Sequence, residues 1–207
     1  MCGFCGKLDK NYICDECKKI LEKVDNIEQY DNENIFYDKH MYLFKYEGII
    51  RQKIIDYKFN EKSYLYKMFE KIILNDKKVC DFIKCYDIII PVPIHYKRKM
   101  ERGYNQTELI VTELCKDINR EADKCLKENK KILMKNKNTV RQSSLNKEQR
   151  SENIKDAYSL NVRENIKNKK ILIFDDIYTT GNTVNECAKV IKKLEPKEIS
   201  VLTIAKD

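Results

Sequence analysis

The chain has 207 residues, a hydrophobic content of 42% and a formal net charge of +8 at pH 7. This length suits one main domain with a small addition, and the apolar content suffices for a hydrophobic core. No apolar run approaches the about 18 residues of a membrane span and no signal peptide opens the chain, so we expect a cytoplasmic protein without membrane insertion. In that compartment the nine cysteines are expected to be reduced or bound to a metal.

Two Cys-x-x-Cys pairs lie near the start of the chain, at Cys2 and Cys5 and at Cys14 and Cys17. Each pair can bind one edge of a metal ion, and the glycines beside the first pair allow a tight turn whose N–H groups point at sulfur. Four thiolates in tetrahedral reach favour a structural Zn²⁺, with an iron–sulfur cluster and unliganded cysteines as the alternatives. Because so short a segment has no core of its own, we expect the metal to supply much of its folding energy.

The cysteine pattern predicts a zinc module with its linker over residues 1–33 and a second domain over residues 34–207. Residues 20–33 are polar and charged, which is typical of a helix end followed by a linker. Aromatic and polar residues alternate over residues 35–46, and this pattern predicts a hairpin. Apolar residues at helical spacing then predict two helices after Gly48, whose apolar stripes we interpret as core.

A short apolar run at residues 87–92 predicts a buried strand that ends at its prolines. A basic segment follows, and we expect a ligand-binding loop there, since α/β sheets bind ligands at the carboxyl ends of their parallel strands. The candidate residues of this loop are Arg98, Lys99, Arg102, Gly103 and Asn105. Asn105 is also expected to cap the helix that follows. The alternative is a basic surface that contacts only solvent.

Another apolar run, at residues 171–174, has the length of a buried strand and stops at two adjacent acids, Asp175 and Asp176. A loop of small residues then precedes an apolar helical pattern; it consists of Thr179, Thr180, Gly181, Asn182 and Thr183. Unpaired N–H groups and hydroxyls at a helix start favour an anion, which predicts a phosphate site. Adjacent carboxylates would repel that phosphate, but they can accept hydrogen bonds from vicinal hydroxyls or hold a hydrated Mg²⁺. The stretch therefore predicts a ribose 5-phosphate site, with a solvated turn as the alternative.

At these residues the sequence resembles the phosphoribosyl pyrophosphate (PRPP) motif of the type I phosphoribosyltransferases. The resemblance implies that Asp175 and Asp176 lie at the ribose hydroxyls and at Mg²⁺, and that residues 179–183 surround the 5-phosphate. The stretch is not a P-loop, because no Gly-Lys-Ser/Thr follows the turn, and it has too few glycines for a dinucleotide fingerprint. A PRPP pyrophosphate also needs nearby cations, for which the basic loop is the candidate.

Over nearly its whole length the chain is similar to the ComF competence family, whose fold is amidophosphoribosyltransferase-like. The similarity is carried by the four-cysteine cluster, PVP at 91–93, RGYNQ at 102–106, DDIYTTGNT at 175–183, and Thr139, Gln142, Leu145, Arg150 and Asn153. One departure concerns Lys135 and Lys137, which stand where we expect arginine. Lysine does not make the bidentate anion contact that arginine makes.

We therefore expect an α/β fold with a parallel sheet flanked by helices, of the type I phosphoribosyltransferase kind, behind a small zinc module. The ComF resemblance implies a PRPP-binding protein that acts in DNA uptake during natural transformation, with other competence proteins as partners. Single-stranded DNA is a further expected partner, because Tyr96 and Tyr104 lie among cations where unpaired bases can stack. An active phosphoribosyltransferase that transfers ribose 5-phosphate from PRPP to a nitrogen nucleophile is the alternative. A zinc-scaffold interaction protein with a vestigial loop is the third hypothesis.

Overall fold

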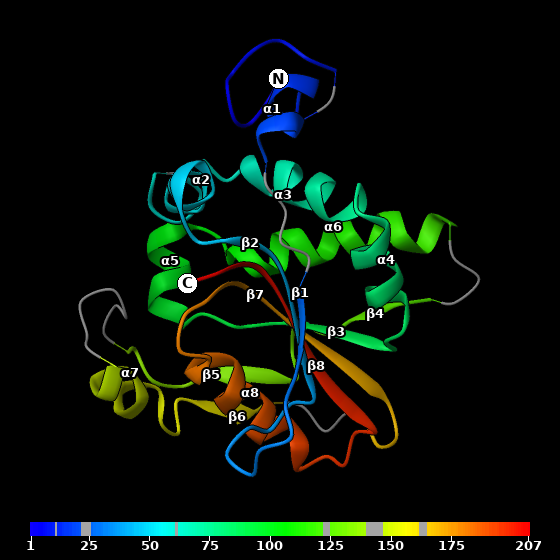
Figure 1. The fold of residues 1–207 in the computed structure, drawn as a ribbon. Coiled ribbons are helices and arrows are strands. Elements are labelled where there is room, and N and C mark those ends of the chain that lie inside the picture. The colour runs from blue at the N-terminus through cyan, green and yellow to red at the C-terminus, as the bar shows by residue number, and fades with distance from the viewer. Residues whose placement is uncertain (11, 22–25, 61, 122–124, 140–146, 162–164) are drawn as a thin grey trace.

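The computed structural model describes residues 1–207 except 11, 22–25, 61, 122–124, 140–146 and 162–164. In the described part of the chain a central sheet has six strands in the order β1-β2-β8-β7-β3-β4 (Figure 1). Their bounds are Asn26–Gln29 for β1, Lys39–Lys45 for β2, Ile88–Pro91 for β3, Lys127–Glu128 for β4, Lys170–Tyr178 for β7 and Glu198–Lys206 for β8. Neighbouring strands are parallel except β1 and β2, which are antiparallel. The expected α/β class is confirmed, with one antiparallel edge.

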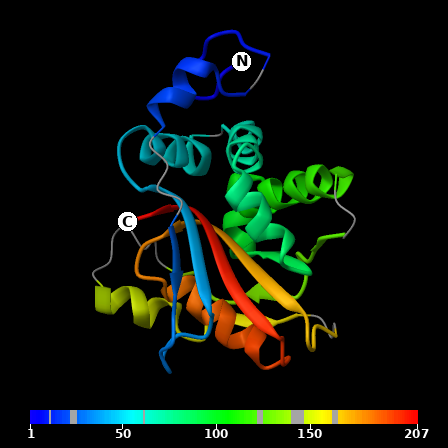
Figure 2. The same ribbon diagram turned by 45° about the vertical axis from the view of Figure 1, so that its right-hand side comes forward.

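Helices cover both faces of this sheet (Figures 1 and 2). The helices are α1 Asp15–Ile20, α2 Gly48–Phe59, α3 Leu65–Leu74, α4 Lys77–Lys84, α5 Tyr96–Arg102, α6 Gln106–Glu121, α7 Lys147–Ile154 and α8 Asn182–Lys192. The helices α2, α3, α4 and α6 lie on one face, while α8 lies on the other. There α8 is joined by a small antiparallel sheet of β5, Leu133–Lys135, and β6, Tyr158–Leu160.

Strand β7 lies in the middle of the molecule, and its side chains alternate between two hydrophobic cores. Leu172 and Phe174 pack with α2, α3, α4 and α6, whereas Ile171 and Ile173 pack with α8 and the small sheet. Successive side chains of a strand point to opposite faces, so a strand covered on both sides must be apolar at every position. This explains the continuous apolar run that the sequence analysis interpreted as a buried strand.

The predicted linker and hairpin are wrong in detail. Within residues 20–33, Asn26–Gln29 form the edge strand β1. The hairpin does not lie within residues 35–46, because Lys39–Lys45 form one strand that pairs with β1 on one side and with β8 on the other. Strand pairing of residues that are distant in sequence decided this arrangement, and local alternation carries no information about it.

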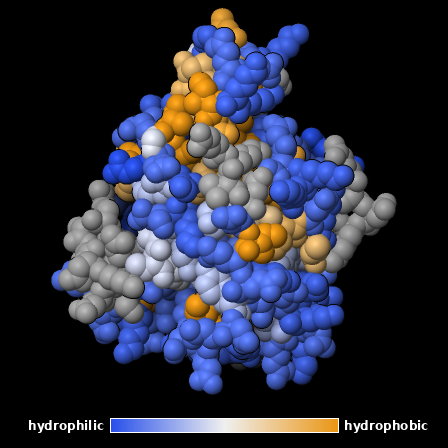
Figure 3. Space-filling model, in the orientation of Figure 1, coloured by the Kyte–Doolittle hydropathy of each residue, from blue (hydrophilic) through white to orange (hydrophobic). Residues whose placement is uncertain are grey.

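The N-terminal segment lies at one end of the molecule and packs against α3 (Figures 1 and 2). The contact is close at Gly3, where a Cβ atom would lie 2.5 Å from the Met68 sulfur. The Lys67 ammonium lies 5.6 Å from the centre of the Tyr12 ring. Figure 3 shows a largely hydrophilic surface on which hydrophobic residues gather beside this segment. In the described part of the chain, no helix combines the length and apolar character that crossing a bilayer requires.

Candidate functional site

The strand–loop–helix unit predicted at residues 171–183 is present, and it forms a small recess at the carboxyl end of β7. The turn into α8 is made at Gly181, which has a φ of 75°, a conformation that side chains other than glycine rarely adopt. A Cβ atom at this position would also overlap the Tyr178 hydroxyl. The recess has a volume of about 10 Å³ and is lined by Asp175, Ile177, Tyr178, Thr179, Gly181, Asn182, Thr183 and Val184. It therefore brings Asp175 together with four of the five predicted phosphate-loop residues.

The two acids lie within β7 and not beyond its end, contrary to the prediction that the strand stops before them. Pairing with β8 continues past them, from Asp175 opposite Thr203 to Tyr178 opposite Lys206. As neighbours in a strand, the two carboxylates have different surroundings. Asp175 faces the recess on the α8 side, whereas Asp176 contacts α2 and α6.

Asp176 is buried and bound by two side chains from the helical face. The Lys58 ammonium at the end of α2 lies 2.8 Å from Oδ1, and the Gln106 amide donates a hydrogen bond of 3.2 Å to Oδ2. Gln106 in turn accepts a hydrogen bond from the Arg102 guanidinium. Lys58 was not predicted as a site residue, since a single lysine in a helix carries no sequence signal that separates it from a solvated one.

Asp175 is half-buried, and its carboxylate accepts a hydrogen bond of 2.9 Å from the backbone N–H of Asp176. Burial and the neighbouring charge of Asp176 raise the pKa of Asp175 to about 8. The charges of Lys58 and Lys135 act in the opposite direction. The site thus places a carboxyl with a raised pKa beside the candidate phosphate loop, as ligand sites often do.

The basic segment after β3 is mostly a helix, α5, and not the loop that we predicted. Gly103 ends it in a left-handed conformation with a φ of 82°. Arg98 is half-buried and donates to the backbone carbonyl of Thr139. Arg102 donates to Gln106, which in turn donates to Asp176, so Arg102 is linked to the acid pair. Parallel pairing of β3 with β7 places α5 and the candidate phosphate loop after the carboxyl ends of neighbouring strands, at the same edge of the sheet.

Two other residues of the predicted basic loop have different roles. Lys99 is exposed and forms a 2.8 Å ion pair with Glu108 on α6. Asn105 is buried and caps α6, as predicted, because its Oδ1 accepts a hydrogen bond from the Thr107 N–H. Its amide donates to the Val92 carbonyl. Neither side chain contacts the acid pair in the described structure.

Lys135 supplies a cation on the other side of the site. Its ammonium lies 5.2 Å from the centre of the Tyr158 ring, and burial, together with the charge of Arg98, lowers its pKa to about 8. Asp175 acts on this lysine in the opposite direction. Lys137 instead donates to the Lys155 carbonyl. Of the other motif residues, Gln142 and Leu145 lie outside the described residues.

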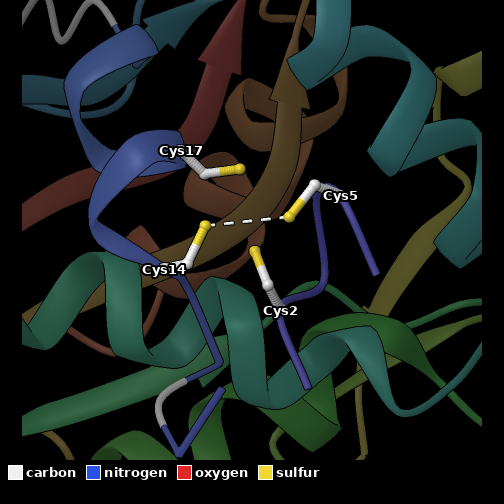
Figure 4. A group of neighbouring side chains, drawn as sticks. All are labelled: Cys2, Cys5, Cys14 and Cys17. Carbon is white, nitrogen blue, oxygen red and sulfur yellow. Dashed lines mark hydrogen bonds between the residues drawn. The ribbon is translucent and has the colours of Figure 1, made fainter. Parts of the chain in front are cut away.

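The four cysteines of the N-terminal pairs form a cluster in which all four sulfur atoms point toward one another (Figure 4). Their Sγ atoms all lie within 4.8 Å of one another, and those of Cys5 and Cys14 are 3.7 Å apart. A tetrahedral Zn²⁺ with Zn–S bonds of about 2.3 Å requires sulfur separations of about 3.8 Å. Burial alone would raise the pKa of Cys2, but hydrogen bonds from the backbone of Cys14, Cys5 and Phe4 lower it to about 6. The cluster is therefore a candidate metal site whose donors and spacing suit Zn²⁺.

Known proteins of two kinds are similar to this chain. The family model of the phosphoribosyl transferase domain matches residues 126–207, which include the β7–α8 unit. Competence protein F of Haemophilus influenzae is 27% identical over 209 residues, and the alignment covers 99% of this chain and 84% of that protein. Together these similarities support a protein of the ComF family. The predicted family and the phosphoribosyltransferase-like fold are both confirmed.

Two further proteins are similar to this chain. Competence protein ComFC of Streptococcus pneumoniae is 24% identical, over 99% of this chain and 80% of that protein. DNA utilization protein YhgH of Shigella flexneri is 30% identical over 105 residues, which are 51% of this chain and 43% of that protein. The cysteine cluster, Lys58 and α5 lie outside the region that matches the phosphoribosyl transferase model.

Proposed function

We propose that this ComF protein binds PRPP at the β7–α8 site and acts in the handling of DNA during natural transformation. The observation that carries the proposal is the spatial order of the chemical groups along the site. The candidate phosphate loop comes first, the acid pair follows, and Lys58 of α2 and Arg102 of α5 come last. PRPP has the matching order of a phosphate, a diol and a diphosphate. The role in DNA uptake is supported by the names of the relatives, which are competence and DNA utilization proteins.

In this proposal the 5-phosphate binds at residues 179–183, where backbone N–H groups at the start of α8 and the Thr hydroxyls donate hydrogen bonds. Asp175 accepts hydrogen bonds from the ribose hydroxyls, because it lines the recess together with this loop. The recess has a volume of about 10 Å³, roughly that of one water molecule, and lies directly at this loop. Arg98 and Arg102 are the arginines that bind the diphosphate.

The acid pair is asymmetric as a candidate Mg²⁺ site. Mg²⁺ prefers carboxylate oxygens and waters and often shares substrate phosphates. Asp175 suits it, because this carboxylate faces the recess, whereas both oxygens of Asp176 already have partners in Lys58 and Gln106. Asp175 would therefore hold the ion, which when bound would neutralise charge on the diphosphate. Asp176 would act by fixing Lys58 and Gln106.

The test of PRPP binding compares PRPP with inorganic phosphate in the double variant Asp175→Asn and Asp176→Asn. The variant removes the charged acceptor for the diol at Asp175 and the charge that fixes Lys58 at Asp176, and it leaves the phosphate loop in place, so PRPP binding should weaken much more than phosphate binding. Each lost hydrogen bond to a charged group contributes about 1.5 to 3 kcal/mol. Isothermal titration calorimetry measures both affinities. An equal loss for both ligands would contradict the proposal, because it would mean that the acids only hold the loop in shape.

Binding of single-stranded DNA is a second part of the proposal, and it depends on α5. Tyr96 is 64% exposed beside Lys97. Its ring lies 4.5 Å from the His95 ring, and its exposed part can stack on a base. The other predicted aromatic, Tyr104, instead stacks on Tyr57 and donates to its backbone carbonyl. We therefore assign base stacking to Tyr96 alone and exclude Tyr104 from this role.

Fluorescence anisotropy with a labelled oligonucleotide tests the DNA proposal. Single-stranded DNA should bind more tightly than duplex, and binding should weaken steeply with salt as counterions are released. Tyr96→Ala should weaken binding by about 1 to 3 kcal/mol, whereas Tyr64→Ala, a control that removes a tyrosine of 50% exposure at the start of α3, should not. Equal affinity for single strands, duplex and heparin would indicate an unspecific basic surface. Pyrophosphate release from PRPP on addition of nitrogen bases would establish the alternative, an active phosphoribosyltransferase.

A further inference from the structure

A helix outside the matched phosphoribosyltransferase region contributes a cation to the acid pair. Lys58 lies in the last turn of α2, and its ammonium is 2.8 Å from Asp176 Oδ1. The Lys58 side chain is 19% exposed, and that of Asp176 is 4% exposed. Asp176 is adjacent to Asp175, which lines the recess with the candidate phosphate loop. The ammonium therefore lies at the edge of the site and retains access to solvent.

A purely structural role does not account well for this ion pair. Taking two charges out of water costs about as much free energy as their attraction returns, so a buried ion pair is weak evidence for stability. The nearby pair of Lys62 and Asp56 is different, because Asp56 also accepts hydrogen bonds from Gln52 and Asn60 and so completes the end of α2. Among the described residues, Lys58 takes part in no such local hydrogen-bond network, although a cation in the last turn of α2 also suits the helix end.

Lys58 also retains donors for a ligand. An ammonium carries three N–H donors. In the described part of the chain, Asp176 is the one residue in ion-pair contact with the Lys58 ammonium, while Asp175 interacts with its charge without such a contact. Up to two donors are therefore available to phosphate oxygens while the ion pair with Asp176 holds the lysine in position.

The position of Lys58 relative to the loop indicates which phosphate it would bind. The candidate 5-phosphate loop starts α8, on one face of the sheet, whereas Lys58 and Gln106 approach Asp176 from α2 and α6, on the other face. Arg102 joins the same group through Gln106. Lys58 and Arg102 thus form a pair of cations on the side of the acids away from the loop.

We propose that Lys58 binds the diphosphate of PRPP and so makes the site prefer PRPP over ribose 5-phosphate. This inference rests on the proposed function, because it assigns one more residue to the same ligand. In the free protein the ammonium pairs with Asp176, and in the complex it donates to a diphosphate oxygen as well. The α2 helix is then part of the ligand site, although the phosphoribosyl transferase model matches only residues 126–207.

The test measures the affinities of two ligands, PRPP and ribose 5-phosphate, by calorimetry in the presence of Mg²⁺. Lys58→Met should weaken PRPP binding by about 10- to 100-fold, the effect of one charged hydrogen bond, and change ribose 5-phosphate binding by less than about threefold. Lys58→Gln keeps a neutral donor to Asp176 and should show the same selective loss, which keeps the test valid if the Met variant is unstable. Lys62→Met, which lies just beyond the end of α2 and pairs with Asp56 of that helix, is the matched control and should change neither affinity.

The outcomes separate this inference from the proposed function. If the unchanged protein binds neither ligand, the proposed function fails. If it binds PRPP and both Lys58 variants lose the two ligands equally, Lys58 only positions Asp176, and the inference is overturned. Unchanged PRPP affinity in Lys58→Gln, with an unchanged melting temperature, would also overturn it. Lys58→Arg should recover part of the preference for PRPP, because the charge and the donors return.

Discussion

The raised pKa of Asp175 predicts that ligand binding depends strongly on pH. Burial and the charge of Asp176 raise this pKa from 3.8 to about 8. A carboxylate must be ionised to hold Mg²⁺, so binding below pH 8 has to release a proton. The apparent affinity for PRPP with Mg²⁺ should therefore fall about tenfold for each pH unit below 8, because one pKa unit corresponds to about 1.4 kcal/mol. At pH 6 it should be about 100-fold below the plateau that we expect above pH 8.

The raised pKa of Asp175 also affects folding stability, which should fall as the pH rises, whereas the affinity for PRPP should increase. The folded protein keeps the Asp175 proton to a higher pH than the unfolded chain does, so it binds more protons between pH 3.8 and about 8. The contribution of Asp175 to the free energy of unfolding is therefore full below pH 3.8 and is lost as the pH rises through about 8. Mg²⁺ and ligand should restore stability at the alkaline end.

Calorimetry in two buffers of different ionisation enthalpy measures the proton release directly. At pH 7 we expect about 0.9 protons released per PRPP, which is the protonated fraction of a group with a pKa of about 8. Asp175→Asn should abolish this release and leave only the titration of the ligand phosphates, so it is the control. Asp176→Asn removes the like charge but keeps Lys58, so the pKa of Asp175 should fall. The pH at which the affinity for PRPP reaches its plateau should then move to a lower value. A PRPP affinity that does not change between pH 6 and 9, or a pH dependence that moves to higher pH in Asp176→Asn, would refute the reasoning.

Two further predictions concern stability and the metal. Burial raises the pKa of Glu70, which is 2% exposed, to about 7, so the protein should lose about 3 kcal/mol of unfolding free energy as the pH rises from 4.5 to 7. In urea unfolding, Glu70→Gln should be more stable than the unchanged protein at pH 8, and an equal effect at pH 5 and pH 8 would contradict this. Freshly purified protein should carry about one Zn²⁺ per chain by metal analysis, because four sulfur donors with tetrahedral spacing bind it tightly. Cys5→Ser with Cys14→Ser should lose the metal and lower the melting temperature, whereas Cys85→Ser, at an exposed thiol outside the cluster, should keep both; metal-free native protein would exclude the site.

The sequence alone determined those features that depend on local chemistry. The apolar run at 171–174 predicts a doubly covered strand, and the small residues around Gly181 predict the turn into α8, because both follow from side-chain character within a few positions. The paired cysteine spacing likewise predicts the cluster of Cys2, Cys5, Cys14 and Cys17, since each pair needs only a tight turn to present two sulfurs. The cap at Asn105 was also predictable, because capping involves residues two or three apart.

Only the tertiary structure decided how these parts combine. Residues 26–29 form a strand because β2 lies beside them, and β7 continues through the two acids because β8 pairs with it past that point. The different surroundings of Asp175 and Asp176 follow from that continuation. The ion pair between Lys58 and Asp176 joins segments that are far apart in the chain, and the energy of such a contact is absent from any short window of sequence. The local pattern therefore predicted which groups the site contains, while long-range strand pairing and helix packing determined which cation lies against which acid.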